Sequence, residues 1–340
     1  MKRSEFFARA LVLTLALGVI LVPAAILLWP RDVIDIHGAM SENGGWSPSA
    51  IQAQAGVPLH LHLTSNDVTH GFAVGQMNMQ PVDVVPGKVT DLTLTFDKPG
   101  TYTFYCTRWC GINHWRMRGT IEVSGSAPVT AASITQPLYV TLGLDIDAPH
   151  PASITPAALP SAPRGQLAAA LLPHNYLAHP YQTVDYYLSH SPAQAFSDLR
   201  ADPGLKSMND AQVWDLVALI WQSNLTPAEL AQGRQLYTQN CAACHGEDKT
   251  GNGVFAERLA ASGQNSTQAM GSTPGMQAQK PANFTDPASM LGASPALLEG
   301  KIKRGGMGTG MPMWGSIFTD EQIKSLVGYL YTSMFDYSHP

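Results

Sequence analysis

The sequence contains few charged residues and very few cysteines. Only 13% of its 340 residues are charged, 20 basic side chains stand against 25 acidic ones, and no polybasic tract occurs. A net charge of −5 without a basic patch argues against a nucleic-acid partner. Four cysteines are too few to staple a small disulfide scaffold, so metal binding explains their close spacing better.

The N-terminal segment is apolar and long enough to cross a bilayer. The run from Ala10 to Trp29 carries no ionisable side chain and is interrupted only by Thr14 and Pro23. The basic residues before it predict a cytoplasmic N-terminus and an exported remainder. A cleaved signal peptide is the alternative, but the run exceeds a usual signal-peptide core. We therefore predict a tail and a single transmembrane helix over residues 1–32.

The next part of the chain has the pattern of short β-strands. Apolar and polar residues alternate over 59–64, 92–96 and 102–106, and glycine and proline separate these stretches. This periodicity predicts an all-β antiparallel sandwich over residues 33–125. Residues 126–183 are rich in proline, alanine and serine, which predicts a linker, although 138–146 could add a strand to the sandwich.

The C-terminal part has helical periodicity instead. Thr226 and Glu229 form a capping box around Pro227, which predicts a helix running toward Cys241. A buried helix face is predicted near the C-terminus by apolar residues spaced i, i+3, i+4 and i+7, namely Ile323, Leu326, Val327 and Leu330.

An internal repeat precedes this region. The same apolar spacing occurs at Val213, Leu216, Val217 and Ile220, and Ser191-Pro-Ala matches Ser294-Pro-Ala. Because the first copy lacks a Cys-x-x-Cys-His motif, we interpret residues 184–224 as a helical half-module without haem. Chance similarity of two amphipathic helices is the alternative.

A cluster of soft metal ligands closes the strand region. Cys106 and Cys110 are four residues apart, His114 and Met117 follow, and His70 lies upstream. Thiolate together with thioether favours copper, because zinc does not need methionine. Two bridging thiolates with one histidine each suit a pair of copper ions. A disulfide between the two cysteines and a zinc site are the alternatives.

These residues resemble the CuA domain of heme–copper oxidase subunit II. The family pattern Ser-x-Asp-Val-x-His-x-Phe followed by Cys-x3-Cys-x3-His-x2-Met is present in order. The resemblance implies a cupredoxin-like Greek-key sandwich and a binuclear copper site. The ligands that it implies are His70, Cys106, the carbonyl of Arg108, Cys110, His114 and Met117.

A second motif is the haem c attachment signature, Cys241-Ala-Ala-Cys244-His245. The two sulfurs would bind the haem vinyl groups and His245 the iron. Met311, in a Gly-Thr-Gly-Met-Pro stretch, is the predicted second iron ligand, with Met313 and Met307 as rivals. This region resembles a class I cytochrome c, which implies an all-α domain over residues 225–340 with one covalent haem c.

The combined resemblance implies the electron-entry subunit of a membrane-bound bacterial terminal oxidase. Electrons from an external donor, such as a cytochrome c or a cupredoxin, would pass through haem c and CuA to subunit I, which reduces O2 to water and translocates protons. The copper and haem domains would lie on the periplasmic side of the cytoplasmic membrane, with further membrane subunits as partners. We expect no catalytic residue in this chain. The alternatives are the equivalent subunit of a CuA-containing nitric oxide reductase and a membrane-tethered electron carrier.

Overall fold

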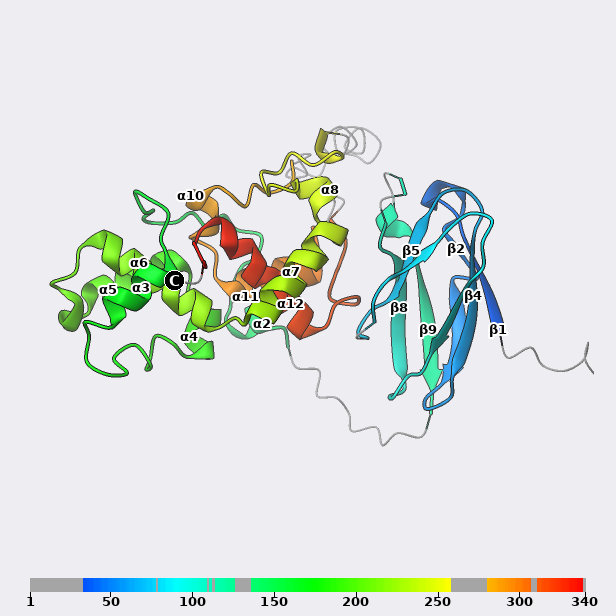
Figure 1. Cartoon of the computed structure of the whole chain (residues 1–340), viewed down its shortest axis with the longest axis horizontal. Helices are drawn as coiled ribbons and strands as arrows, with labels where there is room; N and C mark the ends of the chain where they lie inside the picture. Colours follow the sequence, from blue (N-terminus) through cyan, green and yellow to red (C-terminus); the bar gives the residue numbers. More distant parts are fainter. Residues whose placement is uncertain are drawn as a thin grey trace, which may run out of the picture.

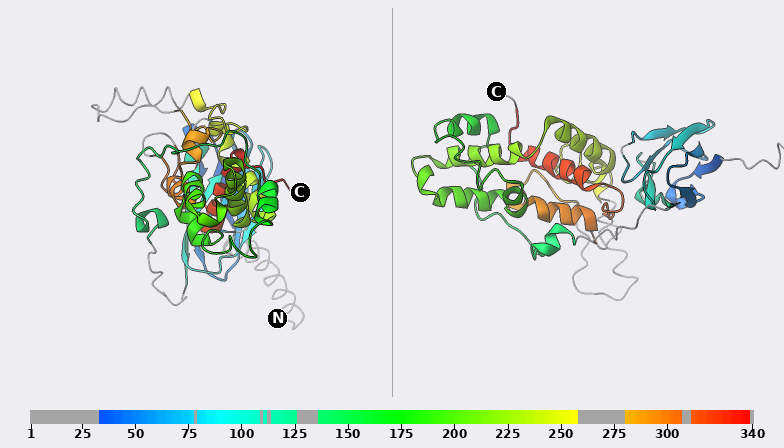
Figure 2. Two further views of the ribbon diagram at one scale, coloured as in Figure 1. Left: turned by 90° about the vertical axis from the view of Figure 1, so that its left-hand side faces the viewer. Right: turned by 90° about the horizontal axis from the view of Figure 1, so that it is seen from below.

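The computed structural model describes residues 33–338, apart from 78, 109, 112–113, 126–135, 258–279 and 307–310. The predicted anchor, residues 1–32, lies outside this description. Within the described ranges, every helix is too short or too polar to cross a bilayer. A β-sandwich and a helical region lie side by side (Figures 1 and 2).

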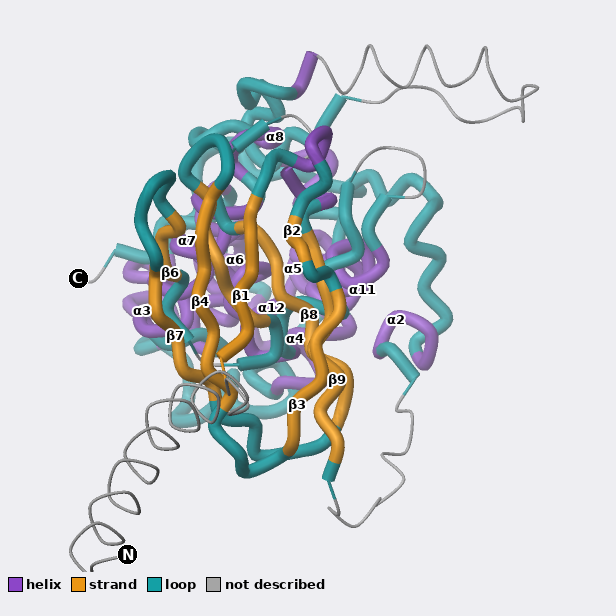
Figure 3. Tube along the Cα trace, turned by 90° about the vertical axis from the view of Figure 1, so that its right-hand side faces the viewer, coloured by secondary structure: helices purple, strands orange, loops and turns teal. Residues whose placement is uncertain are grey.

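The sandwich consists of two sheets packed face to face, with the strands in front of the helices in Figure 3. In spatial order, the four-stranded sheet contains β2 (Trp46–Ser47), β1 (Val33–Gly38), β4 (Leu59–Ser65) and β7 (Thr90–Leu94). The five-stranded sheet contains β3 (Ala50–Gln54), β9 (Arg118–Ser124), β8 (Gly100–Cys106), β5 (His70–Val74) and β6 (Val82–Val84). Leu61, Leu63, Phe72 and Phe104 fill the space between the sheets, as the alternation predicts.

The strand directions differ from the expectation in two places. β1 runs parallel to β4, and β3 runs parallel to β9, whereas the other pairs are antiparallel. Alternation of apolar and polar residues reports which strand face is buried, but it carries no information about the direction of the neighbour. The sandwich was therefore predictable and its purely antiparallel pairing was wrong.

The predicted linker contains helices where residues 136–183 are described. α2 (Leu138–Thr141) replaces the strand considered at 138–146, and its Tyr139 ring lies over Gly300. α3 (Ala162–Ala169) has proline in its first turn, which is a favourable position. The linker prediction was wrong here because alanine and an N-terminal proline are as compatible with a helix start as with an extended chain.

The remaining α-helices are α4 (Val184–Ser189), α5 (Pro192–Ala201), α6 (Asp210–Ser223), α7 (Pro227–Asn240), α8 (Ala242–His245), α10 (Pro287–Met290), α11 (Pro295–Arg304) and α12 (Asp320–Leu330). Short 3-10 turns occupy Ser41–Asn43, His114–Arg116, Pro203–Leu205 and Tyr331–Ser333. The predicted capping box of Thr226 and Glu229 opens α7. Both predicted apolar stripes, on α6 and on α12, are buried in one helical core.

The internal repeat is visible in the helix caps. Ser191 caps α5 as Ser294 caps α11, each through its hydroxyl. Asn209 forms a capping box at α6, and Thr319 forms one at α12. The two copies therefore begin their helices with the same local hydrogen bonds.

The repeat also includes the helix that precedes each copy. α3 crosses α6 at Gly165, where a Cβ atom would lie 2.1 Å from the Asp215 carbonyl oxygen. α7 crosses α12 at Gly233, where a Cβ atom would lie 2.0 Å from the Ser325 carbonyl oxygen. The first copy thus begins at α3 and forms a whole helical frame, rather than the half-module starting at residue 184 that the sequence suggested.

The segment that follows α3 differs from the haem motif that follows α7. It contains Tyr176 and Tyr181, whose hydroxyls donate to the two carboxylate oxygens of Asp202 at 2.5 and 2.9 Å. No cysteine occurs in this copy, so it has no thioether attachment for haem.

The close helix crossing generates a stability prediction. Gly165→Ala should lower the free energy of unfolding by about 1–3 kcal/mol, because the added methyl group overlaps backbone of α6. Denaturant titration measures this loss. Leu167→Ala is the control, because Leu167 lies on the same helix and is 72% exposed. Equal stability of both variants would contradict the close crossing.

Candidate metal centres

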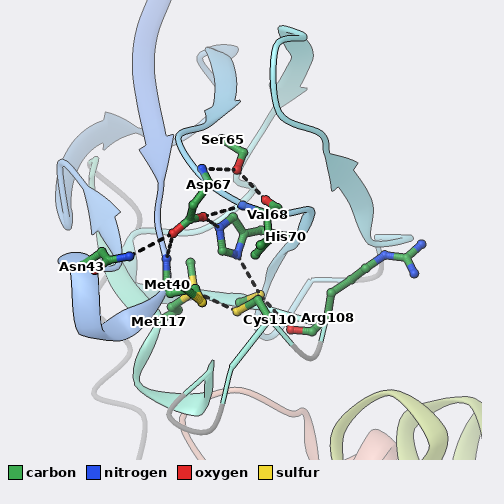
Figure 4. A network of polar contacts seen from close by, with 10 residues as sticks. Met40, Asn43, Ser65, Asp67, Val68, His70, Arg108, Cys110 and Met117 are labelled. Carbon is green, nitrogen blue, oxygen red and sulfur yellow. Dashed lines mark hydrogen bonds and ion pairs between the residues drawn. The ribbon is translucent and has the colours of Figure 1, made fainter.

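The structure brings four of the predicted sulfur and nitrogen ligands together at one end of the sandwich. Cys106 ends β8, Cys110 lies in the loop that follows, and Met117 precedes β9. The Cys106 and Cys110 sulfurs are 3.8 Å apart, and the Met117 sulfur lies 3.3 Å from that of Cys110. His70, at the start of β5, places its Nδ1 atom 3.9 Å from the Cys106 sulfur (Figure 4). Such a group can hold a metal ion.

The two cysteines do not form a disulfide. Their sulfur separation of 3.8 Å is far longer than the roughly 2.05 Å of an S–S bond. The disulfide alternative therefore does not describe this loop.

Asp67 orients the His70 ring. The Nε2 atom of His70 is 2.8 Å from the Asp67 carboxylate, which leaves Nδ1 directed toward Cys106. Backbone N–H groups of Met40 and Val68 each donate to that carboxylate at 2.7 Å (Figure 4). Burial raises the pKa of Asp67, but these hydrogen bonds outweigh burial and lower it to about 2. A carboxylate that fixes the tautomer of a ligand histidine is typical of metal sites.

The two sulfurs carry unequal proton affinities. A hydrogen bond from Cys110 lowers the pKa of Cys106 to about 3, helped by His114 and His70 and opposed by burial. The resulting Cys106 thiolate raises the pKa of Cys110 above its usual range. Two adjacent thiolates, of which that of Cys106 is buried, therefore repel each other unless cations lie against them. This donor set fits soft cations with more than one positive charge in total.

The other two predicted copper ligands also lie at this loop. His114 is buried in the 3-10 turn His114–Arg116. The Arg108 carbonyl oxygen is 3.2 Å from the Cys106 sulfur. The Arg108 side chain points away from the sulfurs (Figure 4). It forms a two-point ion pair with Asp83 at 2.7 and 2.6 Å.

The second motif lies where α7 ends and α8 begins. His245 ends α8, and its Nδ1 atom is 3.0 Å from the Ala282 carbonyl oxygen, which it reaches as a donor. This leaves Nε2 for a metal ion. The Phe284 ring stacks on His245 with centroids 4.6 Å apart. A Cβ atom at Gly253 would lie 2.3 Å from the Ala243 carbonyl oxygen, so glycine permits the tight loop around the motif.

The candidates for the second iron ligand differ in burial. Met311 is partly buried and packs against the helical core, whereas the Met313 side chain is 61% exposed. Met307 lies outside the described residues. The packing favours Met311.

Sequence reasoning did not identify the groups that support these ligands. Asp67 lies three residues before His70, but this spacing alone does not distinguish an aspartate that supports the histidine from one on the surface. Ala282 acts through its carbonyl oxygen, which no side-chain pattern reveals.

Comparison with known proteins finds two family models in separate parts of the chain. The model described as cytochrome c oxidase subunit II, periplasmic domain, matches residues 50–124, and the model described as cytochrome c matches residues 230–333. A cytochrome c oxidase subunit 2 of Thermus thermophilus is 40% identical over 79 residues, 23% of this chain and 58% of the relative. That of Apis mellifera ligustica is 39% identical over 66 residues, 19% of this chain and 29% of the relative.

Two solved structures are similar to part of this chain. A chain of a heme–copper terminal oxidase dimer is 22% identical, with a TM-score of 0.25, over 36% of this chain and 100% of that chain. The periplasmic domain of subunit II of the cytochrome oxidase of Bradyrhizobium japonicum is 18% identical, with a TM-score of 0.24, over 28% and 84%.

The molecule joins a β-sandwich of two sheets to a helical region that contains the Cys-x-x-Cys-His motif. In family terms, residues 50–124 match the periplasmic domain of cytochrome c oxidase subunit II and residues 230–333 match cytochrome c. This confirms the resemblance found in the sequence. The chain matches 58% of the length of its Thermus relative.

The support of His70 by Asp67 generates a prediction about metal affinity. Asp67→Asn should weaken copper binding about 10- to 100-fold, because the ring loses the carboxylate that fixes its tautomer. Titration of the full chain against a copper chelator measures the change. Asp91→Asn on β7 is the control, since its exposed carboxylate pairs with His62 away from the sulfurs. Unchanged affinity in Asp67→Asn would contradict the role of Asp67.

Proposed function

We propose that this chain is the electron-entry subunit of a membrane-bound bacterial terminal oxidase. The observation that carries the proposal is the presence, in one chain, of a pair of adjacent cysteine sulfurs and a Cys-x-x-Cys-His helix, within the regions that match oxidase subunit II and cytochrome c. Electrons would enter from a cytochrome c or a cupredoxin and leave to a separate subunit I, which reduces O2 to water.

The proposed ligands follow from the two sites. A binuclear CuA centre would be held by His70, Cys106, the Arg108 carbonyl, Cys110, His114 and Met117. One haem c would be held by Cys241, Cys244, His245 and Met311. When bound, both groups accept and release single electrons.

The residues of the chain contribute a rigid and largely dry setting. Cys106 and Met117 are buried, and His70 is anchored through Asp67 to the turn after β1. Ligands that are held before and after a change of charge move little, which suits rapid electron exchange.

The remaining expectations are part of the same proposal. Residues 1–32 would anchor the chain as a single transmembrane helix in the cytoplasmic membrane, with the domains on the periplasmic side. Partners would be subunit I and other membrane subunits. No contact in the described residues favours the nitric oxide reductase or the tethered carrier, so both enter as outcomes of the test below.

The packing of Met311 generates a spectroscopic prediction. Met311→Ala in the full chain should convert the haem to a high-spin or differently ligated form and lower its reduction potential, because a thioether ligand raises that potential. Met313→Ala is the matched control, and its absorption spectrum should stay like that of the wild type. A changed Met313→Ala spectrum with an unchanged Met311→Ala spectrum would transfer the role to Met313.

The proposed function is tested by gas consumption. The detergent-solubilised native complex should consume oxygen rapidly when given a reduced cytochrome c or cupredoxin, and it should turn over little nitric oxide. Nitric oxide turnover without oxygen uptake would assign the chain to a nitric oxide reductase. An intact complex that consumes neither gas would favour the tethered carrier.

A further inference from the structure

The loop between α11 and α12 contacts the β-sandwich. We call residues Met313–Phe318 the docking segment. The backbone N–H of Gln76, after β5, donates to the Ile317 carbonyl oxygen at 2.9 Å. The Arg118 Nη1 atom donates to the Met313 carbonyl oxygen at 3.4 Å. The loop reaches the five-stranded sheet in Figure 1 and in the right-hand view of Figure 2.

The contacted surface lies on the outer side of the sheet that holds the sulfur cluster. Ala73, Tyr105 and Arg118 are neighbours in register on β5, β8 and β9. Tyr105 immediately precedes Cys106, and Arg118 immediately follows Met117. Because successive side chains of a strand point to opposite faces, the outward residues are backed directly by two predicted copper ligands.

Aromatic rings fill the contact. The Tyr105 and Phe318 rings meet edge to face, with centroids 6.3 Å apart. The Arg118 guanidinium lies 5.7 Å from the ring centroid of Trp314, which itself stacks on Phe318 at 4.9 Å. Trp314 and Phe318 are only 4% and 2% exposed, so water is largely excluded from these two rings.

The fit is close enough to require glycine. A Cβ atom at Gly75 would lie 2.4 Å from the Ile317 carbonyl oxygen and 2.8 Å from its Cα atom. The backbones of the two domains therefore approach each other more closely than any other residue type at position 75 would allow.

A short route connects the two sites through this contact. Met313 is two residues after Met311, the proposed iron ligand. Its carbonyl oxygen accepts the hydrogen bond from Arg118, which is bonded to Met117 through the backbone. The path between the two sites thus consists of covalent bonds within each domain and of a single hydrogen bond between the domains.

We infer that the docking segment holds the helical domain in a fixed position on the sandwich and that Arg118 and Trp314 couple the two electron sites. This inference rests on the proposed function. With both groups bound, one electron would pass from the ferrous haem to the oxidised copper pair, so that the haem is oxidised and the copper pair reduced by one electron, with no bond or proton transferred. Both residues are positioning residues, because neither is proposed to touch a cofactor.

The first experiment measures the internal electron-transfer rate in the full chain loaded with copper and haem, after photoreduction of the haem. Arg118→Gln and Trp314→Leu should each slow the transfer about tenfold or more, because the domains then meet only as tethered partners. Arg116→Gln is the control, since this arginine is exposed and precedes Met117 in the sequence, whereas Arg118 follows it. Rates within twofold of the wild type in both variants would overturn the inference.

The second experiment needs no cofactor. Hydrogen exchange in the full chain should show a protected amide at Gln76, and Trp314→Leu should remove that protection. An unprotected wild-type amide would overturn the docking. Protection without internal electron transfer would refute the proposed function and leave the docking intact. Rapid transfer without protection would refute the docking and leave the proposed function intact.

Discussion

Two adjacent cysteine sulfurs 3.8 Å apart, of which that of Cys106 is buried, impose the main constraint on this molecule. As thiolates they repel each other, so the surrounding groups must both attract cations and keep the sulfurs in place. The pairing of β5 with β8 sets Phe72 opposite Cys106 and so brings His70 to the cluster. Asp67 then ties that histidine to the backbone of Met40, which extends the support to the turn after β1. Strand β5, strand β8 and the turn after β1 thus together hold the loop that carries the two sulfurs in place.

Different parts of this arrangement were accessible from the sequence to different degrees. The cysteines and methionine of the cluster are local in sequence, so spacing alone indicated a shared site. Strand direction and α3 were missed, because alternation has no direction and because an alanine-rich segment with proline suits both a linker and a helix start. The contact of Arg118 with Trp314 links residues 196 positions apart, and no pattern within either segment indicates it.

The helical region uses one packing solution twice. Gly165 and Gly233 each allow a helix to lie directly on the backbone of its partner. In one copy, the helix that contains Gly233 is followed by Cys241 and the haem motif. In the other, tyrosines hydrogen-bonded to Asp202 follow. The two copies thus share the helix crossing, whereas the segment that follows it differs between them.

The burial of Trp314 and Phe318 determines where another redox protein can bind on this molecule. Trp314 and Phe318 are covered by the sandwich, so an incoming redox protein has no access to them. Under the proposed function, electrons would therefore arrive at and leave from separate surfaces of the helical domain. A new donor would bind while the contact with the sandwich is still in place, and the chain would accept the next electron without separation of its domains.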